Sequence, residues 1–293
     1  MNAESTGMRG PFGAMWVSIR QGIGLLLRRK SAAVGAFFLV TLVFVAIFAD
    51  FLAPYAPDTY TDANSQSPSW AHPFGIDHLG RDIMSRVIYG ARISLRIGIL
   101  AVSISVTIGT AIGLISGYFG GLVDGIIMRL MDIMLALPYI LLAVLITAAL
   151  GPSLENGILA IGIVRIPRFA RLARGSTLSV KTLTFIDASR AVGAPSSRIL
   201  LRDVLPNIAG PLIVYSTLSL GDAILSAAVL SFLGLGAQPP IPEWGAMLND
   251  AQEYLISYPY MSIFPGLAIF FTVLAFNLIG DGVRDILDPK TRR

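Results

Sequence analysis

Six long apolar runs constrain this chain more than any other feature of its sequence. Each is close to or above the roughly 20 residues that an α-helix needs to cross a bilayer. In chain order the runs cover about 31–52, 93–116, 126–150, 157–173, 208–235 and 259–279. Helices of this length satisfy all their backbone polar groups within lipid. The runs predict an all-α polytopic membrane protein, in keeping with 54% hydrophobic and 14% charged residues.

The distribution of Lys and Arg predicts how the chain is oriented. Eight of these residues lie between Arg165 and Arg202, five precede the first run, and four follow the last. The two large loops on the other side hold only Arg81 and Arg86. Because basic residues gather in cytoplasmic loops, we expect both termini to be cytoplasmic. The expected parts are a cytoplasmic segment over 1–30, a transmembrane domain over 31–293 and, within it, a basic cytoplasmic loop at about 174–207.

The loop at about 174–207 contains a polar stretch that we expect to fold as two short helices. They are separated at Gly193-Ala194-Pro195, and before this break apolar residues recur with helical spacing on one face. Pro195 suits the first turn of the second helix, which we expect Pro206 to end. A short amphipathic helix pair in the longest basic loop predicts a docking element for a partner protein.

Several kinds of chemistry have no residues in this chain to carry them. There is no cysteine, and the only two histidines, His72 and His78, lie in a Pro- and Gly-rich loop. No Ser/His/Asp grouping, Gly-x-Ser-x-Gly elbow or P-loop is present. We therefore expect no metal site, no bound cofactor and no enzymatic activity. If the chain belongs to an ATP-driven transporter, the ATPase must be a partner at the cytoplasmic face.

Among the charged residues within the apolar runs, where an isolated charge is unfavourable, Arg129, Asp132 and Asp222 are candidates for a functional role. Arg129 and Asp132 are three apart and therefore neighbours on one helix face, so they could pair near the headgroups or line a translocation path. Asp222 lies near the middle of its run, which contains no partner for it. For these residues a structural role and a role in the path both stay open.

A charged segment precedes the second run. It contains Asp77, Arg81, Asp82 and Arg86. Taken alone, these side chains are most simply interpreted as a solvated, salt-bridged face, in which each exposed pair contributes about 0–1 kcal/mol. This interpretation predicts that the four side chains are exposed.

Residues of the docking loop carry a resemblance to a known family. Asp187-Ala188-Ser189, then Gly193, then Leu205-Pro206 resemble the EAA loop of ABC-importer permeases, with Asp187 in place of the usual Glu and Ser189 in place of the second Ala. At position 203 this chain has Asp where many peptide permeases have His. Four further segments resemble the dipeptide and oligopeptide subgroup, namely Phe74–Leu95, Met131–Pro138, Leu230–Leu248 and Asn277–Lys290.

The resemblance implies the type I importer fold, with six transmembrane helices and a cytoplasmic coupling-helix loop. It implies the second of two permease subunits in a bacterial inner-membrane importer of di- or oligopeptides. The implied partners are a homologous permease, two cytoplasmic ATPases that use ATP and Mg, and an extracytoplasmic substrate-binding protein. The permease itself would bind no cofactor.

The resemblance also assigns roles to particular residues. The ATPase-docking residues would be Asp187, Ala188, Ser189, Gly193, Ala194, Arg198 and Pro206. Asp222, Asp132 and Arg129 are candidates for the translocation path because of their charge within the apolar runs, rather than through the resemblance. The acidic loop could contact the binding protein, and the candidate residues are then Glu243, Trp244, Asp250 and Glu253. The alternative is that this loop forms an ordinary interfacial helix.

Other functions remain open on the sequence alone. Within the same class, related importers carry nickel chelates, glutathione or opines. An ion-coupled secondary transporter would show inverted repeats and buried coupling carboxylates without a docking loop. A membrane-embedded enzyme would need a His, Asp or Ser constellation at one membrane depth, which the sequence does not show.

Overall fold

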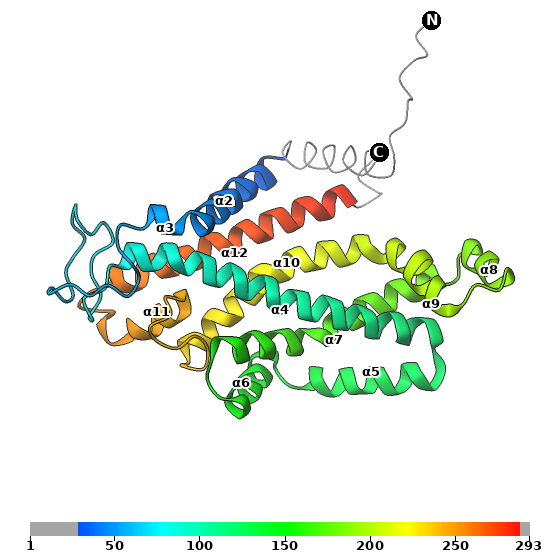
Figure 1. The fold of residues 1–293 in the computed structure, drawn as a ribbon. Helices are drawn as coiled ribbons and strands as arrows, with labels where there is room; N and C mark the ends of the chain where they lie inside the picture. Colours follow the sequence, from blue (N-terminus) through cyan, green and yellow to red (C-terminus); the bar gives the residue numbers. More distant parts are fainter. Residues whose placement is uncertain (1–28, 288–293) are drawn as a thin grey trace, which may run out of the picture.

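The computed structural model describes residues 29–287, and this part of the chain is almost entirely helical (Figure 1). Its only strand-like pairs are two isolated bridges, so the all-α prediction is confirmed. Most of the expected segment 1–30 and the end of the tail lie outside the described residues. The helices are α2 Lys30–Ile47, α3 Ala49–Leu52, α4 Ile83–Phe119, α5 Gly121–Ala136, α6 Tyr139–Leu150, α7 Leu154–Val180, α8 Thr184–Ala191, α9 Ser196–Arg198, α10 Leu205–Phe232, α11 Trp244–Asp250 and α12 Tyr260–Leu287.

Four helical segments are long and apolar enough to cross a membrane: α2, α4, the continuous helix Ser196–Phe232 and α12. A fifth span results if α5 and α6 are taken together. The remaining expected run, 157–173, lies within α7, but α7 carries four arginines and does not qualify by composition. The expected total of six spans therefore stays a prediction.

The run at 126–150 is broken rather than kinked. Instead of one continuous helix, α5 ends at Ala136 and α6 begins at Tyr139, with an angle of 91° between them. Leu137 has extended backbone, because the residue before a proline is disfavoured in the helical region, and Pro138 is the non-helical N-cap of α6. The first residue of α6 is thereby placed beside α7.

The closest helix pair is α4 with α7, and a stripe of glycines makes the approach possible. Gly109, Gly113 and Gly117 recur at four-residue spacing on α4. A Cβ atom at Gly113 would lie 2.4 Å from the carbonyl oxygen of Ala170, and one at Gly109 would lie 2.5 Å from Cβ of Phe169. Small residues at this spacing let membrane helices pack backbone against backbone.

A second layer is formed by α2, α12 and α10. In Figure 1, α2 and α12 run side by side, and α10 lies next to α12. Gly35 of α2 packs closely on Leu278 of α12, and Arg29 forms an ion pair with Asp285 at the end of the two helices. The first helix is thus fixed to the last one by a close contact and a charge pair.

Two irregular regions lie at opposite ends of the helices (Figure 1). We call residues 53–82 together with 233–259 the cap; they include α11 and cover one end of the bundle. The other end carries α8, α9 and the turn between α4 and α5. The expected helix pair of the basic loop is therefore present and lies far from the cap.

Pro206 does not end the second helix of this pair, contrary to expectation. The chain continues from α9 through a π-helical segment, Ile199–Val204, into α10. Proline lacks the N–H that would bond one turn back, and a local widening of the helix accommodates this loss without breaking the helix. The second helix of the pair, α9, is consequently the beginning of a membrane-length helix.

Candidate functional site

The first candidate site is the helix pair formed by α8 and α9. Ile186 is fully buried and anchors α8, whereas Asp187 and Ala188 are exposed and Ser189 is half-buried. Asp187 pairs with Arg190 at 3.2 Å, and the guanidinium of Arg190 lies 5.4 Å from the ring centre of Tyr118 at the end of α4. The helix is held by one buried side chain and one cation–π contact, and most of its surface remains open.

The break between the two helices is a Schellman turn at Gly193. The amide of Ala194 donates to the carbonyl of Ser189 at 3.1 Å, and the amide of Gly193 donates to Arg190 at 2.9 Å. Gly193 has φ of +76°, in the left-handed region that favours glycine, but a Cβ there would meet nothing within 4 Å. Glycine is required at this position by backbone conformation and not by space.

The second helix is anchored on one side and open on the other. Ile199 and Val204 are buried against the bundle, while Arg198 and Pro206 are exposed and Ala194 is half-buried. Exposed apolar side chains flank the pair, with Val192 at 83% and Leu201 at 62% exposure. The predicted docking residues therefore lie on one projecting element, with apolar surface available to a partner.

The second candidate site is a set of exposed charges on α5, α7 and α10, which we call the polar face. Its members are Arg129, Asp132, Arg168, Arg171 and Asp222. The expected pair of Arg129 with Asp132 does not form, because Asp132 pairs instead with Arg171 of α7 at 2.5 Å. In the neighbouring turn Arg174 binds Asp124 through two hydrogen bonds of 2.5 Å. These contacts join α5 to α7.

Asp222 has a partner on a different helix. Its Oδ2 lies 4.0 Å from Nη1 of Arg165, whose Nη2 donates to Ser226 at 2.9 Å. The ring of Tyr139, at the start of α6, has the guanidinium carbons of Arg165 and Arg168 at 5.9 and 5.3 Å. Sequence reasoning did not single out Tyr139. Its position directly after Pro138 in an apolar run was the available signal.

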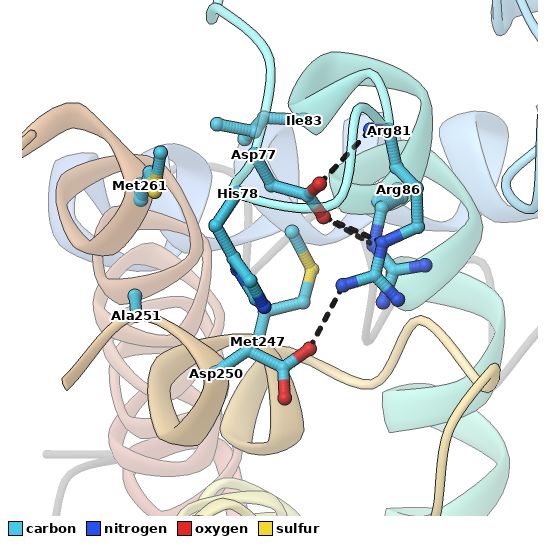
Figure 2. A pocket seen from close by; sticks show the side chains of 9 residues that line it. All are labelled: Asp77, His78, Arg81, Ile83, Arg86, Met247, Asp250, Ala251 and Met261. Carbon is cyan, nitrogen blue, oxygen red and sulfur yellow. Dashed lines mark hydrogen bonds and ion pairs between the residues drawn. The ribbon is translucent and has the colours of Figure 1, made fainter. Parts of the chain in front are cut away.

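Charged side chains of the cap form the third arrangement, and here the expectation of a solvated face is wrong. Asp77, Arg81, Asp82 and Arg86 are all buried, at 8%, 2%, 2% and 2% exposure. Figure 2 shows Arg81 between two carboxylates, with Nε 2.6 Å from Asp77 and Nη2 2.9 Å from Asp250. Asp82 instead caps α4 by accepting from the amide and hydroxyl of Ser85, each at 2.7 Å.

Arg86 is held mainly by backbone oxygens of the cap. Its Nη1 donates to Pro57 at 3.0 Å and to Pro240 at 3.4 Å. The cavity beside it encloses about 10 Å³, room for a single water molecule. Two loops far apart in the sequence are thus joined through one arginine, and the cluster leaves no space for a substrate.

Glu243 and Trp244 are not placed to contact a partner, although the sequence suggested that role for them. Both are 1% exposed: Glu243 caps α11 by accepting from the amide of Ala246 at 2.9 Å, and Trp244 donates to the carbonyl of Val87 at 3.0 Å. Burial raises the pKa of Glu243 above its ordinary value, and hydrogen bonds from Gly245, Ser231 and Ala246 oppose this only in part. Among the four residues suggested, Asp250 is largely engaged by Arg81 and only Glu253 is exposed.

Comparison with protein families gives two matches that together cover most of the chain. Residues 109–293 match the family described as binding-protein-dependent transport system inner membrane component. Residues 23–69 match the N-terminal transmembrane domain of oligopeptide transport permease C.

Curated relatives extend over almost the whole chain. The glutathione transport system permease protein GsiD of Shigella flexneri serotype 5b is 50% identical over 287 residues, covering 97% of this chain and 92% of the relative. GsiD of Escherichia coli O6:K15:H31 is 49% identical over the same length. Among solved structures, the inward-facing MetNI methionine ABC transporter matches with a TM-score of 0.56 and 21% identity, over 70% of this chain and 97% of that chain. This last likeness concerns the fold alone.

Proposed function

The chain belongs to the family of binding-protein-dependent transport system inner membrane components and is a permease subunit of an ABC importer; from this premise we propose that it imports short peptides, glutathione among them. The observation that carries the proposal is the 50% identity, over 97% of the chain, to a glutathione transport permease. The match of residues 23–69 to an oligopeptide permease domain supports the same substrate class. Glutathione is itself a tripeptide, so the two matches agree.

In this proposal the α8 end lies in the cytoplasm and docks an ATPase subunit. The projecting helix pair supports it, with Asp187 and Ala188 exposed and the turn at Gly193 fixed by its own backbone bonds. The second docking helix continues into α10, so a displacement at the pair reaches the membrane region without a flexible joint. A second permease, two ATPases and a substrate-binding protein complete the proposed assembly.

Transport by the purified assembly tests the substrate class. The chain is co-expressed with its partner permease, ATPases and binding protein, reconstituted in liposomes, and supplied with a dipeptide, a tripeptide, glutathione or a nickel chelate. We expect ATP-dependent uptake of peptides, with glutathione as a competitor. Uptake confined to the nickel chelate, or uptake that follows an ion gradient without ATP, would overturn the proposal.

Co-purification of the ATPase tests the docking pair separately from substrate. Gly193→Asp places a side chain at a left-handed position, and Asp187→Arg reverses an exposed charge, so both should release the ATPase while the chain still inserts. Gly175→Asp on α7, where a Cβ also meets nothing within 4 Å, and Asp62→Arg in the cap are matched controls. Normal ATPase recovery and uptake in both docking variants would exclude this role for the pair.

A further inference from the structure

The polar face lies at a depth where exposed charges need an explanation. Arg168 is about 14 residues from the start of α7, roughly 21 Å along the helix. Asp222 is about 10 residues from the end of α10, roughly 15 Å from the same end of the bundle. Ionised side chains near the middle of a membrane face a bundle interior or a water-filled cavity, and they mark substrate paths. The polar face therefore does not face lipid.

The centre of the polar face is built around the break between α5 and α6. The 91° bend exposes non-helical backbone at 137–138, which membranes tolerate only against protein or water. It also places Tyr139 next to Arg165 and Arg168, at 5.9 and 5.3 Å. Transporters commonly form their substrate sites at such interrupted helices near the midplane.

Arg165 is the fixed member of this group. Its side chain is 5% exposed, it bonds Ser226, and its Nε has no hydrogen-bond partner in the described part of the chain. It is held between Tyr139 on α6 and Asp222 on α10. Arg165 thus supplies a buried positive charge 4.0 Å from the carboxylate of Asp222, a positioning role.

Asp222 and Arg168 are the members left open. The carboxylate of Asp222 is 58% exposed, and its one ion pair, at 4.0 Å, is too long for a hydrogen bond. Arg168 is exposed and contacts the Tyr139 ring, and no carboxylate within residues 29–287 forms an ion pair with it. Arg171, one turn further along α7, is by contrast already bound to Asp132. An exposed carboxylate beside Arg165 and an exposed guanidinium beside Tyr139 therefore belong to one group of side chains, because Arg165 also contacts the Tyr139 ring.

We propose that Asp222 and Arg168 form a transient binding site for the two ends of a zwitterionic peptide. Arg168 receives the carboxylate through its planar fork of donors, and Asp222 accepts from the α-ammonium group. Both groups are common to every unmodified peptide, whatever its side chains, and glutathione carries them as well. The proposal rests on the proposed function, and it gives the permease a preference for charged ends rather than for side chains.

Cysteine protection tests binding without relying on transport, since the chain contains no cysteine of its own. Leu225→Cys introduces one thiol near Asp222 on α10, and Leu100→Cys on α4 is the control; Leu225 and Leu100 are 44% and 41% exposed. In the assembly without binding protein, millimolar trialanine should slow labelling of the first thiol and not of the second. Acetyl-trialanine amide, which has neither charge, should protect neither. Equal protection by both peptides, or none by either, would overturn the proposal.

Variants then assign each end of the peptide. Adding Arg168→Gln to Leu225→Cys should reduce protection by trialanine about tenfold and leave protection by trialanine amide unchanged. Asp222→Asn should do the reverse: it should reduce protection by peptides with a free amine and leave protection by acetyl-trialanine, which has only the free carboxylate, unchanged. Arg96→Gln, an exposed arginine on α4, controls for loss of charge. If either variant weakened all peptides alike, the residue would be a contact to the second permease or a structural group.

Uptake distinguishes failure of this inference from failure of the proposed function. The uptake rate of each variant is compared with that of the unmodified chain, using the same peptide-loaded binding protein. The substrate preference of the binding protein is then the same on both sides of the comparison. We expect about tenfold slower uptake of trialanine by Arg168→Gln and Asp222→Asn, with ATPase recovery unchanged. Unchanged uptake would overturn the site alone, whereas an unmodified assembly that imports no peptide would overturn the proposed function.

Discussion

Arg81 of the cap and Asp222 of the polar face differ in burial and in the number of their charged partners. In the cap, Arg81 is 2% exposed and is bonded to two carboxylates. On the polar face, Asp222 is 58% exposed, with only a 4.0 Å pair. Arg81, beyond the apolar helices, is buried and paired twice, whereas Asp222, at membrane depth, is exposed and only weakly paired. Location along the membrane normal therefore does not tell which charges are structural, whereas burial and the number of partners do.

The difference between the cap and the polar face can be tested most directly at Arg81. Arg81→Met leaves half-buried Asp250 without its cation and buried Asp77 with only the 3.9 Å pair to Arg86, and removing one partner of a buried pair costs about 3–5 kcal/mol. Thermal unfolding of the purified protein in detergent should show the largest loss here. Arg168→Met is the matched control and should shift the midpoint far less. Equal shifts would mean that the two regions do not differ.

Trp244 tests whether the cap depends on packing as well as on charge. Trp244→Phe removes the hydrogen bond to Val87 and leaves a small void beneath α11, so we expect a loss of about 1–2 kcal/mol. Phe271→Leu on the exposed side of α12 should have a smaller effect. A midpoint unchanged by Trp244→Phe would show that the cap is held by Arg81 and Arg86 alone.

Glu243 should make the stability of the cap depend on pH. Because burial raises its pKa, the folded protein holds this proton more tightly than the unfolded chain does. Its contribution to stability is complete below the unfolded pKa and is lost as the pH rises through the raised pKa. The stability of Glu243→Gln relative to the unmodified protein, measured as the difference between their unfolding midpoints, should therefore rise between pH 4 and pH 8.

The same pH series includes a control variant and has an outcome that would contradict the prediction. Glu253→Gln removes one carboxyl from an exposed position of the cap. If the two glutamine variants followed the same pH course relative to the unmodified protein, burial of Glu243 would not be the cause of the effect.

The smallest effect is expected on the polar face. Asp132→Asn breaks an ion pair whose side chains are 48% and 53% exposed, and pairs of this kind contribute about 0–1 kcal/mol. The unfolding midpoint should hardly move. A large loss would show that the polar face is buried against a partner in the purified state, and it would remove the contrast with the cap.

The sequence predicted the helices and the α8–α9 helix pair because their signals are local. Apolar length indicated the membrane runs, and the polar stretch with its glycine and two prolines indicated the helix pair. It also placed the break at Gly193, where the left-handed φ of +76° needs glycine. Pro206 was misjudged because a widened helical turn takes up the lost hydrogen bond.

The partners of the charges were not predictable, because they come from distant segments. Asp250 follows Arg81 by 169 residues, and only the folded cap brings the two together. Asp132 had Arg129 as a neighbour three residues away, but the register of α5 against α7 places it on Arg171 instead. Spacing along one helix gives candidate pairs, whereas packing between helices decides among them.

The unbroken helix from Ser196 to Phe232 has a mechanical consequence. Its 37 residues make it a lever, with the docking turn at one end and Asp222 about 26 residues, or roughly 39 Å, along the arm. A tilt of about 10° about the far end of such an arm swings the other end by roughly 7 Å. A small rotation of this helix would thus suffice to move the carboxylate of Asp222 toward or away from Arg165. The proposed ATPase-docking turn and the proposed peptide site would then be linked by one continuous helix.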